Sequence, residues 1–168
     1  MRRSVVLVTV ALCGCGCEIT TPKVARIPWR QAEYDALAKT GTGILRGQAF
    51  LKTRGGDVKT AAGNPVSLDP VTSSSRQWYE VVILQNKELE PADDATKAHI
   101  LEYKRLTTAD ADGRFEFKNV PPGDYFLSTQ VIWEAPTGYQ GSLVKQGGPI
   151  VKQITVNDGE EQQVILTR

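Results

Sequence analysis

Short runs of alternating apolar and polar residues, separated by turn residues, fill the chain from residue 43 to its end. In residues 43–51, Leu45, Ala49 and Leu51 fall on one side of an extended chain. A period of two is typical of strands with one buried face. Comparable runs occupy residues 58–61, 66–68, 104–120, 125–133, 150–156 and 162–167. The pattern predicts an all-β fold, an antiparallel β-sandwich of about seven to eight strands.

Two turns carry strong local signals. Asp112-Gly113, within residues 104–120, predicts a β-hairpin, because this dipeptide accepts the positive φ angles of a tight turn. Pro122-Gly123 predicts a type II turn, because proline fixes φ at the first central position and glycine accepts positive φ at the second.

The segments between these runs are less regular. Residues 78–84 (WYEVVIL) are apolar on both faces, which predicts a central strand. Residues 73–76 and 134–149 read as loops, and residues 157–160 as the turn of a final hairpin. Residues 86–103 are polar and read as an insertion or a long loop, with a short helix predicted at residues 91–99.

Helix-forming residues precede the β region. Residues 29–39 contain alanine, glutamine, glutamate and leucine, with Pro28 suited to a first helical turn and Gly41 placed to end it. This pattern predicts a short helix packed on the domain. The preceding polar residues, up to Ile27, read as a tether.

The chain begins with a short export signal. Arg2 and Arg3 precede an apolar run at residues 4–12, which is too short to span a bilayer, since a spanning helix needs about 20 apolar residues. The sequence LCGC (residues 12–15) resembles a bacterial lipobox. The resemblance implies cleavage before Cys15 and a diacylglycerol on its thiol.

Neighbouring cysteines fit the lipobox less well. Cys17 would place Gly14 where an aliphatic residue is expected, and Cys13 would lack the small residue before it. By the same resemblance, Gly16 after the lipidated cysteine implies sorting to the outer membrane. Each buried methylene of an acyl chain contributes roughly 0.8 kcal/mol, so several fatty acyl chains anchor a protein stably. The expected organisation is a signal peptide (1–14), a lipid-anchored tether with a short helix (15–42) and the β-sandwich (43–168).

Composition narrows the chemistry. All three cysteines lie within the first seventeen residues, so the exported body has no internal disulfide and no catalytic or metal-binding thiol. Removing Arg2 and Arg3 with the signal leaves 18 basic against 19 acidic residues, a net charge of −1. Nothing here favours nucleic acid, which requires a clustered basic face. No cofactor is expected.

One stretch carries a family resemblance. The segment DGRFEFKNVPPGDYFL, residues 112–127, resembles the signature hairpin of carboxypeptidase regulatory-like domains, which are prealbumin-like β-sandwiches. GQAFL (residues 47–51) and GNPVSL (residues 63–68) are similar to the first two strands of that family. The chain departs from the family in its longer middle segment, residues 70–103. The resemblance implies the fold and little catalytic activity.

Three candidate ion or catalytic sites have weak support. Residues 110–113 offer only two carboxylates for calcium, which takes six to eight oxygen ligands, and a polar hairpin tip is the simpler explanation of these residues. His99 and Glu102 form an H-x-x-E motif, but His99 is the single histidine of the chain, and a catalytic zinc needs three protein ligands. The adjacent Asp93 and Asp94 resemble a glycosidase acid pair only in composition.

The sequence therefore predicts a non-enzymatic, membrane-anchored envelope lipoprotein, facing the periplasm from the outer membrane. Its sandwich is expected to act as a structural or protein-interaction module with an unidentified envelope partner. The alternative is a carbohydrate-binding module with Tyr139 and Trp133 as ligand-binding aromatics. Three other aromatics, Trp29, Trp78 and Tyr79, are further candidates for a sugar-stacking platform, with core packing or loop anchoring as the favoured role.

Overall fold

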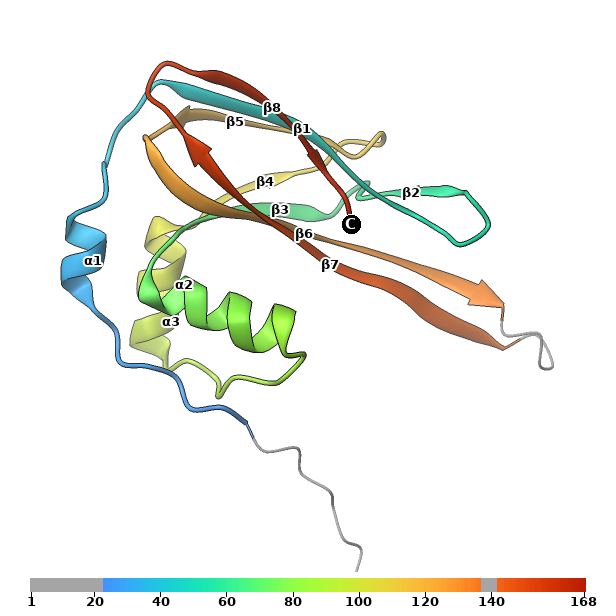
Figure 1. The fold of residues 1–168 in the computed structure, drawn as a ribbon, viewed down its shortest axis with the longest axis horizontal. Coiled ribbons are helices and arrows are strands. Elements are labelled where there is room, and N and C mark those ends of the chain that lie inside the picture. The colour runs from blue at the N-terminus through green and yellow to red at the C-terminus, as the bar shows by residue number, and fades with distance from the viewer. Residues whose placement is uncertain (1–22, 137–141) are drawn as a thin grey trace, which may run out of the picture.

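Two β-sheets packed face to face form the body of the protein. The computed structural model describes residues 23–136 and 142–168. Its strands are β1 (Gly43–Lys52), β2 (Val58–Thr60), β3 (Pro65–Pro70), β4 (Arg105–Thr108), β5 (Arg114–Val120), β6 (Gly123–Pro136), β7 (Leu143–Val156) and β8 (Glu161–Leu166). One sheet joins β2, β5 and β8 to β1, and the other has the order β4-β3-β6-β7 (Figure 1). The predicted all-β sandwich is confirmed.

Residues from both sheets fill the interior. The largest fully buried side chains of this core are Leu45, Leu68, Leu127, Ile150, Leu166, Val66, Val120, Val131 and Val156. Phe115 and Phe117 join them, as their spacing of two predicts. Burying a side chain of this size contributes roughly 1.5–3 kcal/mol, so the interface between the sheets is the main source of stability.

The last strand joins an unexpected partner. β8 runs parallel to β1, with Ile44 opposite Glu161 and Ala49 opposite Leu166. The predicted final hairpin is therefore wrong, because residues 157–160 carry the chain from one sheet to the other. Apolar alternation in β7 and β8 fits two strands stacked across the core as well as two strands paired in one sheet.

The Asp112-Gly113 turn likewise links the sheets. β4 pairs with β3 and β5 pairs with β1, so residues 104–120 do not form the predicted hairpin ladder. The turn itself is tight, since Gly113 N donates to Asp110 O over 2.9 Å and Gly113 has φ +77°. The later Gly123 has φ +154°, positive but far from the roughly +80° of a type II turn.

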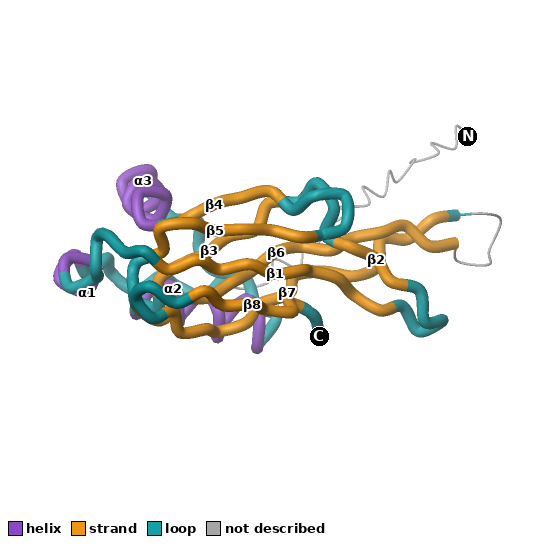
Figure 2. The backbone as a smooth tube through the Cα atoms, turned by 90° about the horizontal axis from the view of Figure 1, so that it is seen from above, coloured by secondary structure: helices purple, strands orange, loops and turns teal. Residues whose placement is uncertain are grey.

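A helical layer covers the outer face of the second sheet. Its elements are α1 (Gln31–Asp35), α2 (Ser73–Trp78), the π-helix η1 (Tyr79–Leu84) and α3 (Asp94–Tyr103). Figure 2 shows α1 and α3 at one end of the strands. The short helices predicted at residues 29–39 and 91–99 are present with shifted bounds.

Two predictions for the middle segment are wrong. Residues 73–76 are helical instead of a loop, and residues 78–84 are a π-helix instead of a central strand. Thr72 caps the helix, and Tyr79 stacks on Phe126 of β6 with ring centroids 4.9 Å apart. A short run that is apolar on both faces is compatible with a buried strand or with a covering helix. Here the Thr72 cap starts a helix, and the chain continues as a helix through residues 78–84.

A long hairpin replaces the loop predicted at residues 134–149. β6 and β7 stay paired out to Pro136 opposite Leu143. The resulting hairpin arm (residues 131–136 and 143–148) projects beyond β3 and β5 (Figure 1). Its exposed apolar side chains include Ile132, Leu143 and Val144. Across residues 23–136 and 142–168, no helix is long and apolar enough to cross a membrane.

Candidate functional site

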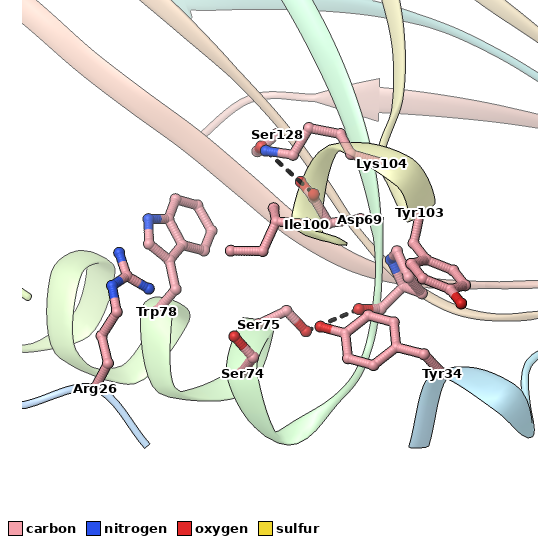
Figure 3. A pocket seen from close by; sticks show the side chains of 11 residues that line it. Arg26, Tyr34, Asp69, Ser74, Ser75, Trp78, Ile100, Tyr103, Lys104 and Ser128 are labelled. Atoms are coloured by element: carbon pink, nitrogen blue, oxygen red, sulfur yellow. Dashed lines mark hydrogen bonds and ion pairs between the residues drawn. The ribbon is translucent and has the colours of Figure 1, made fainter. Parts of the chain in front are cut away.

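A cleft of about 280 Å³ opens between the helical layer and the outer face of the second sheet. Its lining comprises three aromatic residues (Tyr34, Trp78, Tyr103), three charged residues (Arg26, Asp69, Lys104), three serines (Ser74, Ser75, Ser128), Pro70 and Ile100. Arg26 and Trp78 lie at one end, and Tyr34 and Tyr103 at the other (Figure 3). The volume is near the lower end of small-molecule sites, about 300–1,000 Å³.

The segment before α1 forms one wall of this cleft. The sequence predicts residues 23–27 as part of a tether, but they are hydrogen-bonded to the loop between η1 and α3 and to Gln77 of α2. Val24 N donates to Glu88 O over 2.8 Å, and Glu90 N donates to Val24 O over 2.9 Å. We call residues 23–28 the strap, because these contacts fasten it to the domain.

One amide side chain fixes the strap at the cleft. Gln77 accepts from Ile27 N over 3.0 Å and donates to Ala25 O over 2.8 Å. Both contacts flank Arg26, whose Nε donates to Glu90 O over 2.6 Å. The backbone around Arg26 is therefore held on each side.

The first turn of α2 anchors the cleft to the sheet. Thr72 accepts from Ser75 N, while Ser75 Oγ accepts from Thr72 N over 2.9 Å, a reciprocal cap. Ser75 Oγ also donates to Pro70 O over 2.8 Å, at the end of β3. The Tyr34 hydroxyl lies 3.0 Å from Thr72 Oγ1, and burial raises the pKa of this phenol.

Aromatic rings stack behind the Tyr34 end of the cleft. Trp29 stacks on Tyr34 with centroids 3.9 Å apart and on His99 at 5.0 Å, and Tyr103 tilts against Tyr34 at 4.8 Å. This cluster joins α1 to α3. His99 Nδ1 lies 3.8 Å from a Glu102 carboxylate oxygen. Within the described residues, no group of three or more His, Cys, Asp or Glu side chains is placed to hold a metal.

A polar network lines the sheet side. Lys104 Nζ lies 3.2 Å from an Asp69 carboxylate oxygen, and the two side chains are 26% and 15% exposed. Ser67 Oγ donates to Asp69 Oδ2 over 3.0 Å and lies 2.8 Å from Ser128 Oγ. Because the pair is largely buried, its opposite charges offset each other inside the cleft.

Glu33 ties α1 to α2 and makes that contact sensitive to pH. Its Oε2 accepts from Ser73 N over 2.6 Å, and this hydrogen bond lowers the pKa of Glu33 from its ordinary value of 4.5. A pKa lowered by folding stabilises the fold above the unfolded value, and that contribution disappears as pH falls through the lowered pKa.

We expect Glu33→Gln to lower the free energy of unfolding by about 0.3–1 kcal/mol at pH 7, the range for a negative charge near a helix N-terminus. The glutamine keeps an acceptor for Ser73 N and loses only the charge. The difference from wild type should shrink below pH 4.5, as measured by urea denaturation at several pH values. A difference that stays constant down to pH 3 would contradict this assignment.

The structure places the sequence-derived site candidates apart. Trp133 is half-buried on the core-facing side of β6, so it lies away from the cleft, and a Cβ at Gly147 would come within 2.7 Å of its ring. Tyr139 and Cys15 lie outside the described residues. Trp78, one of the further aromatic candidates, lines the cleft.

The acidic candidates have structural partners. Asp110 Oδ1 accepts from the backbone N of Asp112 and of Arg114 over 2.9 and 2.8 Å, as in a polar turn. Asp93 accepts from Thr96 N over 2.7 Å and caps α3, and this hydrogen bond lowers the pKa of Asp93. The neighbouring acid at position 94 forms an ion pair with a lysine one turn later.

Sequence reasoning missed most of the cleft because its residues come from separate segments: Arg26 from the strap, Tyr34 from α1, Trp78 from α2, and Tyr103 and Lys104 from the end of α3. One local signal was available. Thr72 followed three residues later by Ser75 is a helix-start pattern, and it would have placed Trp78 on a helix.

Comparison with known proteins gives one informative likeness. No protein family model matches the chain, and no curated protein sequence matches it, so the resemblance to carboxypeptidase regulatory-like domains stays a prediction. Among solved structures, the chain is similar to PA1324 from Pseudomonas aeruginosa, described as a "putative carbohydrate binding protein". The two are 27% identical, with a TM-score of 0.74, over 85% of this chain and 99% of that one.

Proposed function

We propose that this protein is a non-catalytic, membrane-anchored envelope protein whose β-sandwich binds a carbohydrate in the cleft. The observation that carries the proposal is the cleft lining, with aromatic rings at both ends and hydroxyl and charged groups between them. Aromatic faces pack on the C–H faces of sugar rings, and the polar groups fix the orientation. The likeness to PA1324, with the function in its description, supports the same ligand class.

We expect Trp78→Ala to weaken glycan binding about tenfold, because the loss of one stacking ring removes about 0.5–1.5 kcal/mol beyond its buried area. A glycan array identifies the ligand, and calorimetric titration measures the affinity. Trp78→Phe keeps a ring and should retain most of the binding. Trp133→Ala is the matched control, since Trp133 lies on the core-facing side of β6.

Two results would reject carbohydrate binding in the cleft. One is an array without signal for the folded wild-type protein. The other is unchanged affinity in Trp78→Ala with lost affinity in Trp133→Ala, which would move the site to the hairpin arm. Thermal unfolding of each variant separates lost binding from lost fold.

The anchor is the second part of the proposal. Lipidation at Cys15 would leave eight residues before the strap begins at Lys23, a length that cannot exceed about 28 Å when fully extended. The strap is fastened to the helical layer, so this arrangement would hold the cleft close to the outer membrane surface.

We expect Cys15→Ser to abolish metabolic labelling with palmitate and to release the protein from the membrane fraction. Cys17→Ser is the matched control and should keep both the label and the fractionation. Label that persists in Cys15→Ser and disappears in Cys17→Ser would assign the lipid to the other cysteine.

A protein-interaction module is the second candidate function. The hairpin arm favours it, because Ile132 and Leu143 are 46% and 57% exposed and point to the same face of this projecting hairpin. Exposed apolar groups gathered in one place are a feature of protein contact sites. If the array is silent, cross-linking from cysteines placed on this arm is the experiment that follows.

A further inference from the structure

We infer that the cleft binds an acidic sugar, one that carries a carboxylate, and that Arg26 is the group that binds this carboxylate. The inference rests on the proposed function and names the ligand class of that same cleft. It follows from the charges of the lining residues and from the hydrogen bonding of Arg26, whose terminal nitrogens have no partner among the described residues.

Arg26 supplies the net charge of the cleft. The lining contains one acid, Asp69, and its carboxylate is paired with Lys104 at 3.2 Å. Asp69 is further held by Ser67, so Lys104 is committed to a hydrogen-bonded partner. The two charges cancel, and the charge of the guanidinium remains. A neutral sugar would leave that charge uncompensated, whereas a carboxylate would offset it.

Arg26 is also held ready for a bidentate partner. Its Nε donates to Glu90 O, and this contact sets the direction of the guanidinium plane. Among residues 23–136 and 142–168, the two terminal nitrogens have no hydrogen bond, and no carboxylate lies within 4.0 Å of them. Two parallel N–H groups match the two oxygens of a carboxylate.

The surroundings of Arg26 suit a sugar acid better than a free carboxylate. Arg26 and Trp78 lie at the same end of the cleft (Figure 3), so a carboxylate on the guanidinium would place the attached ring in the part of the cleft that Trp78 lines. The strap is fixed on both sides of Arg26 by Gln77, so little side-chain and backbone freedom remains to be lost on binding. The cleft volume of about 280 Å³ fits one sugar unit better than a long chain.

The test compares each acidic sugar with its own methyl ester, which removes the charge and keeps the ring. The probes are short oligomers of galacturonate, glucuronate and mannuronate, each as free acid and as methyl ester, titrated into the full chain. We expect wild type to bind at least one acid tenfold or more tighter than its ester. Arg26→Gln should bind that acid and its ester equally.

Two further variants sharpen the comparison. Lys23→Gln removes a positive charge from the same strap, at an exposed ion pair with Glu88, and should keep the preference for the acid. Arg26→Lys keeps the charge without the paired N–H groups and should keep only part of the preference. Thermal unfolding verifies that each variant is folded.

The outcomes separate the inference from the proposed function. Equal binding of acid and ester by wild type, or a preference that survives Arg26→Gln, would overturn the inference and leave carbohydrate binding intact. Tighter binding of a neutral glycan from the array would do the same. No binding of any acidic, esterified or neutral glycan would remove the proposed function itself.

Discussion

Replacing Phe126 with alanine is expected to lower the free energy of unfolding by about 3–5 kcal/mol, the range for removal of a buried phenylalanine ring. Phe126 is 1% exposed, yet it lies outside the core between the sheets. It points to the outer face of the second sheet, where Tyr79 stacks on it at 4.9 Å. The substitution therefore removes the contact that fastens η1 to the sheet.

Leu127→Ala is the matched comparison, because Leu127 is the next residue of the same strand and points into the core between the sheets. Both variants should be destabilised in chemical denaturation. Hydrogen exchange distinguishes them, since Phe126→Ala should speed exchange first in residues 73–84, while Leu127→Ala should act on the strands. If Phe126→Ala lowers the free energy of unfolding by less than about 1 kcal/mol, well below the range for a buried phenylalanine, the stacking of η1 on the sheet would be contradicted.

The covering helices explain why the sequence pattern predicted a central strand at residues 78–84. In β6, alternation identified the core face correctly, with Tyr125, Leu127 and Val131 buried together. Phe126 is an apolar residue on the mostly polar outer face of β6. An apolar side chain there indicates that another element packs on that face. The apolar run at residues 78–84 is the cover, and periodicity alone does not separate a short buried strand from a short covering helix.

Strand partners are harder to predict than strands. Alternation at i and i+2 specifies which side chains face the core, and it is the same for two strands paired in one sheet and for two stacked across the core. The turns at residues 110–113 and 157–160 were located correctly, but each joins two sheets. Pairing depends on contacts distant in sequence, such as β8 against β1.

A site made of contiguous residues can be predicted from sequence more easily than a site assembled from separate segments. The lipobox around Cys15 is a contiguous pattern, so the sequence alone suffices to predict it. The cleft is assembled from the strap, three helices and two strands, and no short motif encodes it. Arg26 lies in a polar segment, and polarity alone predicts a tether there. The hydrogen bonds of this segment to the rest of the domain show that it forms a wall of the cleft.

Gly113→Ala is expected to destabilise the protein by about 2–4 kcal/mol, the sum of a backbone cost and a steric cost. Gly113 has φ +77°, which costs an L residue about 1–2 kcal/mol. A Cβ there would lie 2.5 Å from Ala49 O and 3.0 Å from the Thr60 Cβ, because the turn packs against β1 and β2. Ala49 N donates to Gly113 O over 2.8 Å, so moving the turn away would break a β1 hydrogen bond.

Gly63→Ala separates the two costs. Gly63 has φ +72°, close to that of Gly113, but a Cβ there would meet no atom of the described residues within 4 Å. Only the backbone cost of about 1–2 kcal/mol applies to it. Urea denaturation of both variants should therefore show the larger loss for Gly113→Ala, with unchanged m-values. Equal losses would mean that the turn is free of β1, and the link between the two sheets would then not depend on this close approach.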